Sequence, residues 1–599
     1  MIVADFIVNF LADKGIDTIF MVTGGQAMFL NDAVYRNKKI KPIFTHHEQA
    51  AGMAAEAYGR ITGKIGVAMV TAGPGGINIL NGVVGAWSDS APMMVISGQS
   101  ALSNVQYMER TKIRQLGLQG INTKLLARGI TKYFVTVDDP TKIAYYLEKA
   151  YYLATSERRG PVWIEVPLDL QRAEVLIKLL EQFEIPQDKE DESLLNNQVS
   201  KVLALLGKSQ RPLLLVGQGV RIADASKLLT QIIKKTKIPV VTSRLGIDLI
   251  ESDHLQFVGR PGLYGDRAAN FAVQNADLIL AVGARLDTGI VGYDPHDWGR
   301  NAKKIVVDID IEELNKPGIE TTLKINTDAK NFFNELLLQL ESKKLLSFRK
   351  WTGICNDWKK RYPMVLPSYK KEKPVNSYYF TERLAKSASG KDMIVVDTSS
   401  CFHVVCQTWK IKKGQRFLTT GGISTMGYWP AGIGVCLANK KRRVIVITGD
   451  GSFQMNIQEL ATIKQNDLPI KVFIFNNNGY LLIRHTQKTH MEGRLMGESP
   501  KTGLWFPDLM KIAKAYRIKG VRIESVDEVD QKIREVLNYN GPVICDVVTP
   551  KWQLIIPRIA SEKRPDGSLI SKPYEDLFPF LSKDELLSNM IVKSKVSKD

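Results

Sequence analysis

The stretch from Gly449 to Asn478 reads GDGSFQMNIQELATIKQNDLPIKVFIFNNN, and the fold can be read outward from it. The apolar, β-branched run 444–448 in front of it predicts a buried strand that ends in a glycine turn, where a helical pattern begins. That helix is expected to run to about Asn466, and 471–475 predicts the next buried strand. Strand, turn, helix and strand in this order are typical of a parallel α/β sheet.

The turn carries a candidate site for a metal ion and a diphosphate. Gly449 and Gly451 let the backbone approach a ligand, and the helix N-terminus that continues through Ser452 favours an anion. Asp450 would repel a phosphate unless a divalent cation lay between them, and Mg²⁺ prefers such oxygen ligands. A side-chain amide among 476–478 could be the second ligand, because neighbouring parallel strands end at the same sheet edge.

The GDGS turn followed by paired asparagines resembles the thiamine diphosphate signature of the acetolactate synthase family. The resemblance implies that Asp450 and Asn477 bind Mg²⁺ by side chain and Gly479 by its carbonyl, with Tyr480 beside the cofactor. It also implies an α/β fold of three doubly wound parallel-sheet domains. We expect a pyrimidine-binding domain at 1–178, a central FAD- or nucleotide-binding-like domain at 196–345, and a diphosphate-binding domain with a C-terminal lid at 374–599. An ordinary glycine turn is the alternative for the tripeptide alone.

Size and composition exclude several classes of protein. The chain has 599 residues, of which 44% are hydrophobic and 24% charged, which predicts a globular protein of several domains. The net charge of +19 is spread over predicted surface helices and loops, so we expect a basic surface that attracts anionic ligands, with no nucleic-acid partner. Five cysteines without ligand spacing predict neither disulfides nor zinc. Without a signal-like N-terminus or an apolar run of membrane-spanning length, a cytoplasmic protein is expected.

A glutamate near the N-terminus is the first catalytic candidate. Strand-like and helical runs alternate over 1–178, and 44–48 is a short strand that ends in polar residues. The small-residue helix 49–60 behind it suits close packing at a subunit interface. The motif HExAAxxAxxYGR resembles the glutamate motif of the family, which implies that Glu48 contacts the N1′ atom of the cofactor's aminopyrimidine ring. The alternative is a helix-capping or surface glutamate.

Two further motifs in this domain resemble the family. Gly73, Pro74 and Gly75 form a glycine turn similar to its cofactor-binding GPG loop, although glycine turns end many strands. Acetolactate synthases keep a phenylalanine–glutamine pair facing the reacting carbon; here Gln119 matches the glutamine and Leu118 replaces the phenylalanine. Gln119 is therefore the second catalytic candidate.

The middle of the chain predicts a nucleotide-binding-like sheet. One strand ends in a turn with Gly217 and Gly219, another in Gly283 followed by Arg285, and a third in Asp308. Such ends could hold a dinucleotide such as FAD, or could be plain turns. The order resembles the central domain of acetolactate synthase, which binds FAD, whereas the same domain of decarboxylase relatives is empty.

The third domain offers further cofactor contacts. Ser399 and Ser400 follow a predicted strand, as a diphosphate-side loop would, but depart from the stretch that family members carry there. Residues 421–427, GGISTMG, resemble the GGxGTMG segment of the family. The resemblance implies that Met426 holds the two cofactor rings in a bent shape and that the Ser424 carbonyl receives the 4′-amino group; a core methionine is the alternative.

The stretch after the metal motif departs most from the family. Thr486 stands where acetolactate synthases hold the tryptophan that restricts the acceptor, which predicts a roomier acceptor site. Possible contacts for an anionic acceptor, or equally ordinary surface charges, are Arg110, Arg114, Arg484 and His485. This stretch and the turn-rich tail 558–581, expected to form a lid, resemble acetolactate-synthase-like proteins of surface polysaccharide pathways. Some of these proteins add a two-carbon unit to a nucleotide-linked keto sugar.

The predicted activity is a thiamine diphosphate- and Mg²⁺-dependent carboligation, in which a 2-oxo acid such as pyruvate loses CO₂ and its acyl unit passes to a carbonyl acceptor. The acceptor could be a nucleotide-linked keto sugar. The alternatives are acetolactate synthesis with pyruvate or 2-oxobutyrate as acceptor, a flavin-dependent pyruvate oxidase, and a cofactor-binding protein without catalysis. The resemblance implies a homodimer or homotetramer in which Glu48 and Asp450 meet across the subunit interface.

Overall fold

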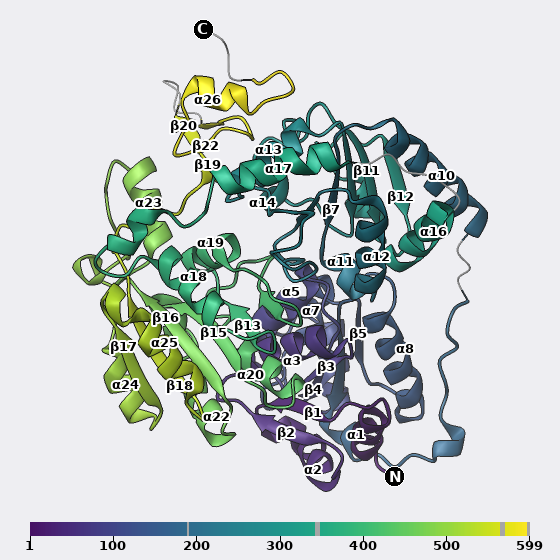
Figure 1. The fold of residues 1–599 in the computed structure, drawn as a ribbon. Helices are drawn as coiled ribbons and strands as arrows, with labels where there is room; N and C mark the ends of the chain where they lie inside the picture. The colour runs from purple at the N-terminus through teal and green to yellow at the C-terminus, as the bar shows by residue number, and fades with distance from the viewer. Residues whose placement is uncertain (188–190, 342–347, 564–568, 596–599) are drawn as a thin grey trace.

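The chain folds around three parallel sheets. The structure, a computed structural model, describes residues 1–187, 191–341, 348–563 and 569–595 (Figure 1). Each large sheet has six strands and is accompanied by helices, which confirms the predicted α/β class with three doubly wound domains. The sheets lie within the three predicted domain ranges; the predicted central-domain end at 345 falls outside the described residues. None of the described helices is long and apolar enough to cross a membrane.

The first sheet has the strand order β2-β1-β3-β4-β6-β5. Its central strands are buried along their whole length, as expected for a sheet covered on both sides. The strand order reverses between β1 and β3, so a crevice opens at the carboxyl ends of these strands. The strands are β1 (Thr18–Met21), β2 (Lys41–Phe44), β3 (Gly66–Val70), β4 (Met93–Gln99), β5 (Tyr133–Thr136) and β6 (Pro161–Pro167); the longer helices are α1 (Val3–Asp13), α2 (Met28–Arg36), α3 (Glu48–Thr62), α5 (Leu80–Ser88), α6 (Leu102–Arg110) and α8 (Ile143–Thr155).

The central sheet has the strand order β12-β11-β10-β7-β8-β9, which is the order of dinucleotide-binding folds with its reversal between β7 and β10. Its strands are β7 (Pro212–Val216), β8 (Val240–Thr242), β9 (Phe257–Gly259), β10 (Leu278–Val282), β11 (Lys303–Asp308) and β12 (Leu323–Asn326). The helices are α10 (Glu192–Lys208), α11 (Gln218–Ile222), α12 (Ser226–Thr236), α13 (Arg267–Asn275), α14 (Thr288–Val291), α15 (Ile311–Asn315), α16 (Ala329–Glu341) and α17 (Arg349–Arg361).

The third sheet has the order β14-β13-β15-β16-β18-β17 and reverses between β13 and β15. Its strands are β13 (Met393–Val396), β14 (Arg416–Thr419), β15 (Val444–Gly449), β16 (Ile470–Asn476), β17 (Lys519–Ile523) and β18 (Val543–Val548). The helices are α18 (Ser377–Ser387), α19 (Ser399–Thr408), α20 (Ala431–Ala438), α21 (Asp450–Gln454), α22 (Glu459–Gln465), α23 (Leu481–His490), α24 (Leu509–Ala515) and α25 (Val529–Asn538).

The single helix expected up to Asn466 is in fact two helices, α21 and α22. The chain between them leaves regular helix at the buried Asn456, whose side-chain amide donates to the carbonyl of Gly427 at 2.7 Å. Asparagine often favours such bonds over helix-interior positions.

The small-residue helix α3 packs within the chain, against α20 of the third domain. A side chain at Gly434 would come within 1.9 Å of the carbonyl oxygen of Ala54, so the two backbones touch. This face was expected at a subunit interface. The structure corrects that expectation, since in one chain the same face joins the first domain to the third.

The tail packs on α13 of the central domain. Asn270 donates to the Tyr574 carbonyl at 3.0 Å, Gln274 to the Glu575 carboxylate at 3.0 Å, and Asn275 to the Asn589 carbonyl at 3.0 Å. The buried polar face of α13 therefore holds the described tail residues on the central domain, while 564–568 of the predicted lid lie outside the described residues. The tail elements are β19 (Arg558–Ile559), β20 (Ser561–Lys563), β21 (Leu569–Ser571), β22 (Leu577–Phe578) and α26 (Lys583–Ser588).

Candidate active site

An acid and an amide lie together at the carboxyl edge of the third sheet. Asp450 follows β15 and Asn477 follows β16, and these strands are paired in parallel up to Gly449 and Phe475. Both side chains are buried, at 3% and 4% exposure. Among the described residues, the Oδ1 atom of Asn477 is buried without a hydrogen-bond partner. A buried oxygen without a donor, beside a buried carboxylate, is what a cation site requires.

The surroundings of Asp450 fit a divalent cation. Its carboxylate accepts from the backbone N–H groups of Gly451 at 2.8 Å and Gly479 at 3.1 Å. Burial raises the pKa of Asp450 to about 7, although these N–H groups lower it. A bound Mg²⁺ would favour the ionised form. A side chain at Gly451 would approach the Tyr480 ring to 2.1 Å, so only glycine fits between the ring and the turn.

Asp397, which the sequence analysis missed, joins the strand ends of this site. It is fully buried at the end of β13, and its carboxylate accepts from Thr398 N at 2.7 Å, Gly427 N at 3.2 Å and the Thr448 hydroxyl at 2.9 Å. Burial raises its pKa to about 6. Helix α19 starts one turn later at Ser399, so two helix N-termini, of α19 and α21, lie at this sheet edge.

Residues 420–427, here named the cofactor loop, are held from two domains. A side chain at Gly451 would lie 3.1 Å from the Met426 methyl group, so Met426 is next to the metal turn. Gly421 N and Gly422 N donate to the carboxylate of Asp89 at 2.9 and 2.7 Å. Asp89 ends α5 of the first domain and was not singled out by the sequence analysis, because a single aspartate before a strand carries no distinctive pattern.

Glu48 forms a second half-site in the first domain. It begins α3 with 9% exposure, and its Oε2 atom accepts from Asn78 at 3.0 Å. Gly75 is beside it, since a Cβ there would lie 3.7 Å from Oε1. Gly73, at φ +64°, abuts the carbonyl of Gln119, where a Cβ would be 2.6 Å away. The structure thus brings Glu48, the glycine turn with Pro74, and Gln119 together.

Glu48 and Asp450 make no direct polar contact. Between described residues, no hydrogen bond or ion pair links them. The segment between α6 and α7 (Thr123–Ala127) is largely exposed, with Leu118 at 73% exposure and Arg114 and Gln119 also exposed. In one chain the segment that carries Gln119 therefore faces solvent.

The acceptor candidates on α23 differ in their surroundings. Arg484 forms a buried ion pair with Glu498 at 2.5 Å and also donates to the Asn478 carbonyl at 3.2 Å and to the Lys551 carbonyl. Arg484 therefore stabilises the loop that contains Asn477 and Asn478, and its guanidinium group does not face an acceptor. A ring nitrogen of His485 lies 2.9 Å from the Gln553 carbonyl, and burial lowers the pKa of this histidine. Thr486 is exposed, as is Arg110 on α6.

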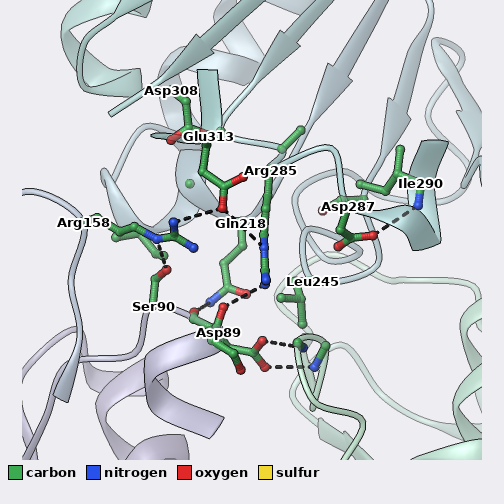
Figure 2. Close-up of a pocket in the computed structure, with 18 of the residues that line it drawn as sticks. Asp89, Ser90, Arg158, Gln218, Leu245, Arg285, Asp287, Ile290, Asp308 and Glu313 are labelled. Atoms are coloured by element: carbon green, nitrogen blue, oxygen red, sulfur yellow. Dashed lines mark hydrogen bonds and ion pairs between the residues drawn. The ribbon is translucent and has the colours of Figure 1, made fainter. Parts of the chain in front are cut away.

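A cavity of about 490 Å³ lies outside the carboxyl ends of the central sheet, where the strand order reverses between the paired strands β7 and β10 (Figure 2). We name it the central cavity. Gly219, Gly283, Arg285 and Asp308 line it, as predicted for a dinucleotide site, whereas Gly217 packs against the Gly283 carbonyl just behind. Its walls come from all three domains, and the residues missed by sequence reasoning are Asp89, Ser90, Arg158, Gln218, Arg244, Leu245, Asp287, Glu313, Phe402 and His403.

The two ends of the central cavity differ in chemistry. Figure 2 shows Arg158 and Arg285 pointing toward Glu313, at 3.0 and 3.5 Å. Burial raises the pKa of Asp308 at this end to about 6. At the other end the His403 ring stacks on Tyr264 with centroids 3.8 Å apart. An acid at a strand end, arginines and aromatic rings suit the ribose, diphosphate and ring system of a dinucleotide.

Comparisons with known proteins agree with this geometry. Three family profiles match: "Thiamine pyrophosphate enzyme, N-terminal TPP binding domain" over 1–124, "Thiamine pyrophosphate enzyme, central domain" over 199–336, and "Thiamine pyrophosphate enzyme, C-terminal TPP binding domain" over 397–547. A "Probable acetolactate synthase large subunit" of Methanocaldococcus jannaschii is 32% identical over 560 residues, covering 91% of each chain. The chain belongs to the acetolactate synthase family of thiamine diphosphate enzymes.

Other relatives in this family agree. The "Acetolactate synthase large subunit" of Lactococcus lactis is 30% identical over 93% of this chain and 94% of its own. The "Acetolactate synthase catalytic subunit, mitochondrial" of Saccharomyces cerevisiae is 30% identical over 92% of this chain and 81% of its own. The chain is accordingly an acetolactate-synthase-like carboligase dependent on thiamine diphosphate, a transferase of acyl or aldehyde units.

Proposed function

We propose that this enzyme decarboxylates pyruvate and transfers the remaining two-carbon unit to a carbonyl acceptor. The observation that carries the proposal is the unpartnered, buried Oδ1 of Asn477 beside the buried carboxylate of Asp450. Together with the Gly479 carbonyl, these atoms would hold the Mg²⁺ of a thiamine diphosphate–metal complex. When bound, thiamine diphosphate supplies the electron sink that decarboxylation of a 2-oxo acid needs.

The residues of the chain have distinct roles in this proposal. Glu48 would hold a proton toward the N1′ atom of the bound cofactor, in an orientation that Asn78 fixes by its hydrogen bond. Met426 would contact the cofactor, and the N-termini of α19 and α21, with Ser400 and Ser452, would bind the diphosphate. Gln119 orients the substrate carbonyl, and the buried walls exclude water.

We further propose that the working site needs two copies of the chain. Glu48 and Asp450 make no direct polar contact within the chain, so Glu48 of one copy would serve the cofactor held by the Asp450 of its partner. A homodimer is the smallest such assembly, and a homotetramer would contain two of them. The five cysteines are buried and unpaired, which supports a reducing compartment such as the cytoplasm.

Two acceptor classes follow from different observations. The names of the relatives support a second 2-oxo acid, pyruvate or 2-oxobutyrate, as acceptor. The small, exposed Thr486 on α23 and the exposed Leu118 favour a larger acceptor, for which a nucleotide-linked keto sugar of a surface polysaccharide pathway is our second candidate.

We infer that the central cavity binds FAD. Its place where the strand order reverses between β7 and β10, its volume and its arginines beside Asp308 support a dinucleotide. If the flavin took electrons from the reaction, the enzyme would be a pyruvate oxidase. Oxygen or quinone reduction during turnover with pyruvate separates that alternative from carboligation.

The decisive experiment incubates the purified enzyme with thiamine diphosphate, Mg²⁺ and pyruvate, alone and with nucleotide-linked 4-keto sugars, and follows CO₂ and product masses. Acetolactate formed from pyruvate, undiminished by any sugar, establishes the 2-oxo acid acceptor. A sugar product heavier by an acetyl unit establishes the sugar acceptor. Absence of CO₂ release under every condition, from protein shown to bind the cofactor, contradicts the proposed function.

A further inference from the structure

Four arginines converge where the three domains meet. Arg60 is on α3 and Arg159 is just before β6, both in the first domain; Arg221 is on α11 of the central domain, and Arg416 begins β14 of the third. They line a cavity of about 50 Å³ next to the central cavity, which we name the junction cavity. Asp248 is the one acidic side chain among the described residues that line it.

Asp248 is shared between two of these cations. Its carboxylate lies 3.0 Å from Arg221 Nη2 and 2.8 Å from Arg416 Nε. The Nε atom of Arg221 is buried and has no hydrogen-bond partner among the described residues. Burial lowers the pKa of Arg416, and the neighbouring Arg221 lowers it further although Asp248 opposes this. Two guanidinium groups therefore have half of the negative charge that would balance them.

The other two arginines bring no spare carboxylate to the junction. Arg60 is balanced by Glu56 at 3.0 Å and Asp89 at 3.8 Å. Arg159 donates to the Gly63 carbonyl at 3.2 Å and, among the described residues, forms no ion pair within 4.0 Å. Burial lowers its pKa. Among the described residues, three carboxylates lie within 4.0 Å of the four guanidinium groups, and Arg159 has only the weaker electrostatic influence of Asp328 and Asp224.

Cations buried with too few counter-charges are costly, and a bound anion relieves that cost. A guanidinium group presents a planar fork of donors that matches oxyanions. The volume of about 50 Å³ is several times the roughly 10–15 Å³ that one water needs. We propose that the junction cavity is a binding site for a small oxyanion of phosphate size, held by Arg159, Arg221 and Arg416.

The junction cavity adjoins the central cavity. The residues that line both cavities are Ser90, Arg159, Gln218, Ile222 and Leu245. Arg221, Asp248 and Arg416 line the junction cavity and not the central cavity, so the anion would lie on that side of the shared wall. The three arginines that hold it come from three different domains, and the anion therefore stabilises the arrangement of the domains. Its binding does not depend on the acceptor or on turnover.

The test is a titration of inorganic phosphate into enzyme saturated with thiamine diphosphate, Mg²⁺ and FAD, followed by calorimetry and by the unfolding temperature, against chloride at matched ionic strength. Saturable binding of phosphate and a rise in unfolding temperature are expected. Arg221→Gln and Arg159→Gln should each weaken the phosphate dissociation constant roughly 10- to 100-fold, the loss expected for a hydrogen bond to a charged group.

The control is Arg361→Gln, since Arg361 is an exposed residue of α17 paired with Asp357 at 2.8 Å, and phosphate binding should be unchanged. If Arg221→Gln does not fold, Arg159→Gln decides, because removing Arg159 leaves no carboxylate unpaired. No saturable phosphate effect, wild-type affinity in both variants, or phosphate binding that is present without FAD and lost when FAD saturates its site would each overturn the proposal. None of these readings requires a catalysed reaction, so they stand apart from the test of the proposed function.

Discussion

Separate sets of hydrogen bonds position the carboxylates of Glu48 and Asp450. Asn78 orients Glu48 at the start of α3, and backbone N–H groups hold Asp450 at the start of α21. The difference between them is what surrounds the carboxylate. Glu48 has an amide donor and a glycine turn beside it, whereas Asp450 has an unpartnered amide oxygen and two N–H donors, which suits a cation.

Glu48→Gln keeps the size of the side chain but removes the carboxylate. We expect kcat to fall by roughly 10²- to 10⁴-fold, the contribution of a positioned acid or base, while the affinity for thiamine diphosphate changes little. Turnover and cofactor binding by fluorescence quenching measure the two effects. Glu109→Gln, on the surface beside Lys124, is the control. Activity of Glu48→Gln within about tenfold of wild type would exclude this role.

Asn477→Ala tests the cation site. Since Oδ1 of Asn477 has no protein partner among the described residues, its removal should cost little stability. The Mg²⁺ concentration for half-maximal activity should rise by at least the roughly 10- to 100-fold that loss of an outer-shell partner causes. A magnesium titration of the variant measures this, with the exposed Asn315→Ala as control. An unchanged magnesium requirement would mean that Asn477 is not a ligand.

A buried glutamate of β6 sets a pH dependence of stability. Glu165 accepts from Gln99 at 3.0 Å and from the Thr136 hydroxyl at 2.9 Å, and burial raises its pKa to about 7. The folded state keeps a proton that the unfolded state releases, so stability falls as the pH rises from about 4.5 to 7 and then levels off. The shift corresponds to about 3 kcal/mol.

Glu165→Gln removes this proton linkage. The difference between the unfolding temperatures at pH 5 and pH 8 should be smaller in the variant than in the wild type, because other buried acids contribute equally to both proteins. Thermal unfolding at a fixed scan rate measures it. Parallel pH profiles of the two proteins would show that Glu165 does not carry the raised pKa.

At the scale of elements, the cofactor loop is held by carboxylates from two domains. Asp89 at the end of α5 and Asp397 at the end of β13 both accept backbone N–H groups from it. The loop also lines the central cavity, so one strip of backbone borders both cofactor sites. The segment after α23 also stabilises a loop of the site, since Glu498 forms a buried ion pair with Arg484, which bonds to the Asn478 carbonyl.

Asp89→Asn should loosen the cofactor loop. An amide can accept one of the N–H groups of Gly421 and Gly422 but presents its NH₂ group to the other, so one of two bonds is lost. We expect weaker binding of thiamine diphosphate by about 5- to 20-fold, with a smaller effect on kcat at saturation. Separate measurement of the cofactor dissociation constant and kcat tests this. A loss of kcat with unchanged cofactor affinity would contradict a positioning role.

At the scale of the whole molecule, helix α3 of the first domain packs against α20 of the third domain. This contact fixes the position of Glu48 relative to Asp450 within the chain. Under our proposal, a second copy of the chain supplies the partner acid to each site.

Mixing two inactive variants tests the shared site. Glu48→Gln and Asp450→Asn should each be nearly inactive alone, yet a mixed dimer retains one site with both native acids. After dissociation and reassembly of an equal mixture, about a quarter of the wild-type sites should be restored, the statistical share for random pairing of two copies. Activity measured before and after reassembly is the readout. If the mixture stays as inactive as its components, both acids act within one chain.

Local pattern in the sequence was sufficient for the class of fold. The run before Gly449 and the segments around Glu48 and Asn477 predicted strands and helices that the structure contains, since strand, turn and helix signals act over a few residues. The same local pattern gave wrong predictions where contacts between distant parts of the chain determine the structure. The single helix to Asn466 is interrupted, and the small residues of α3 face α20 of the same chain.

The sequence by itself determined three α/β units, because strand, turn and helix signals depend on residues close together in the chain. Its resemblance to a known family indicated the thiamine diphosphate chemistry, and the residues assigned to that chemistry stay predictions. Only the tertiary structure decided which residues far apart in the sequence contact one another around these sites. Asp89 holds a loop 332 positions away, the tail covers α13, and four arginines from three domains share one junction. These contacts depend on how the sheets pack against one another, and burial then sets the charge and pKa of each group.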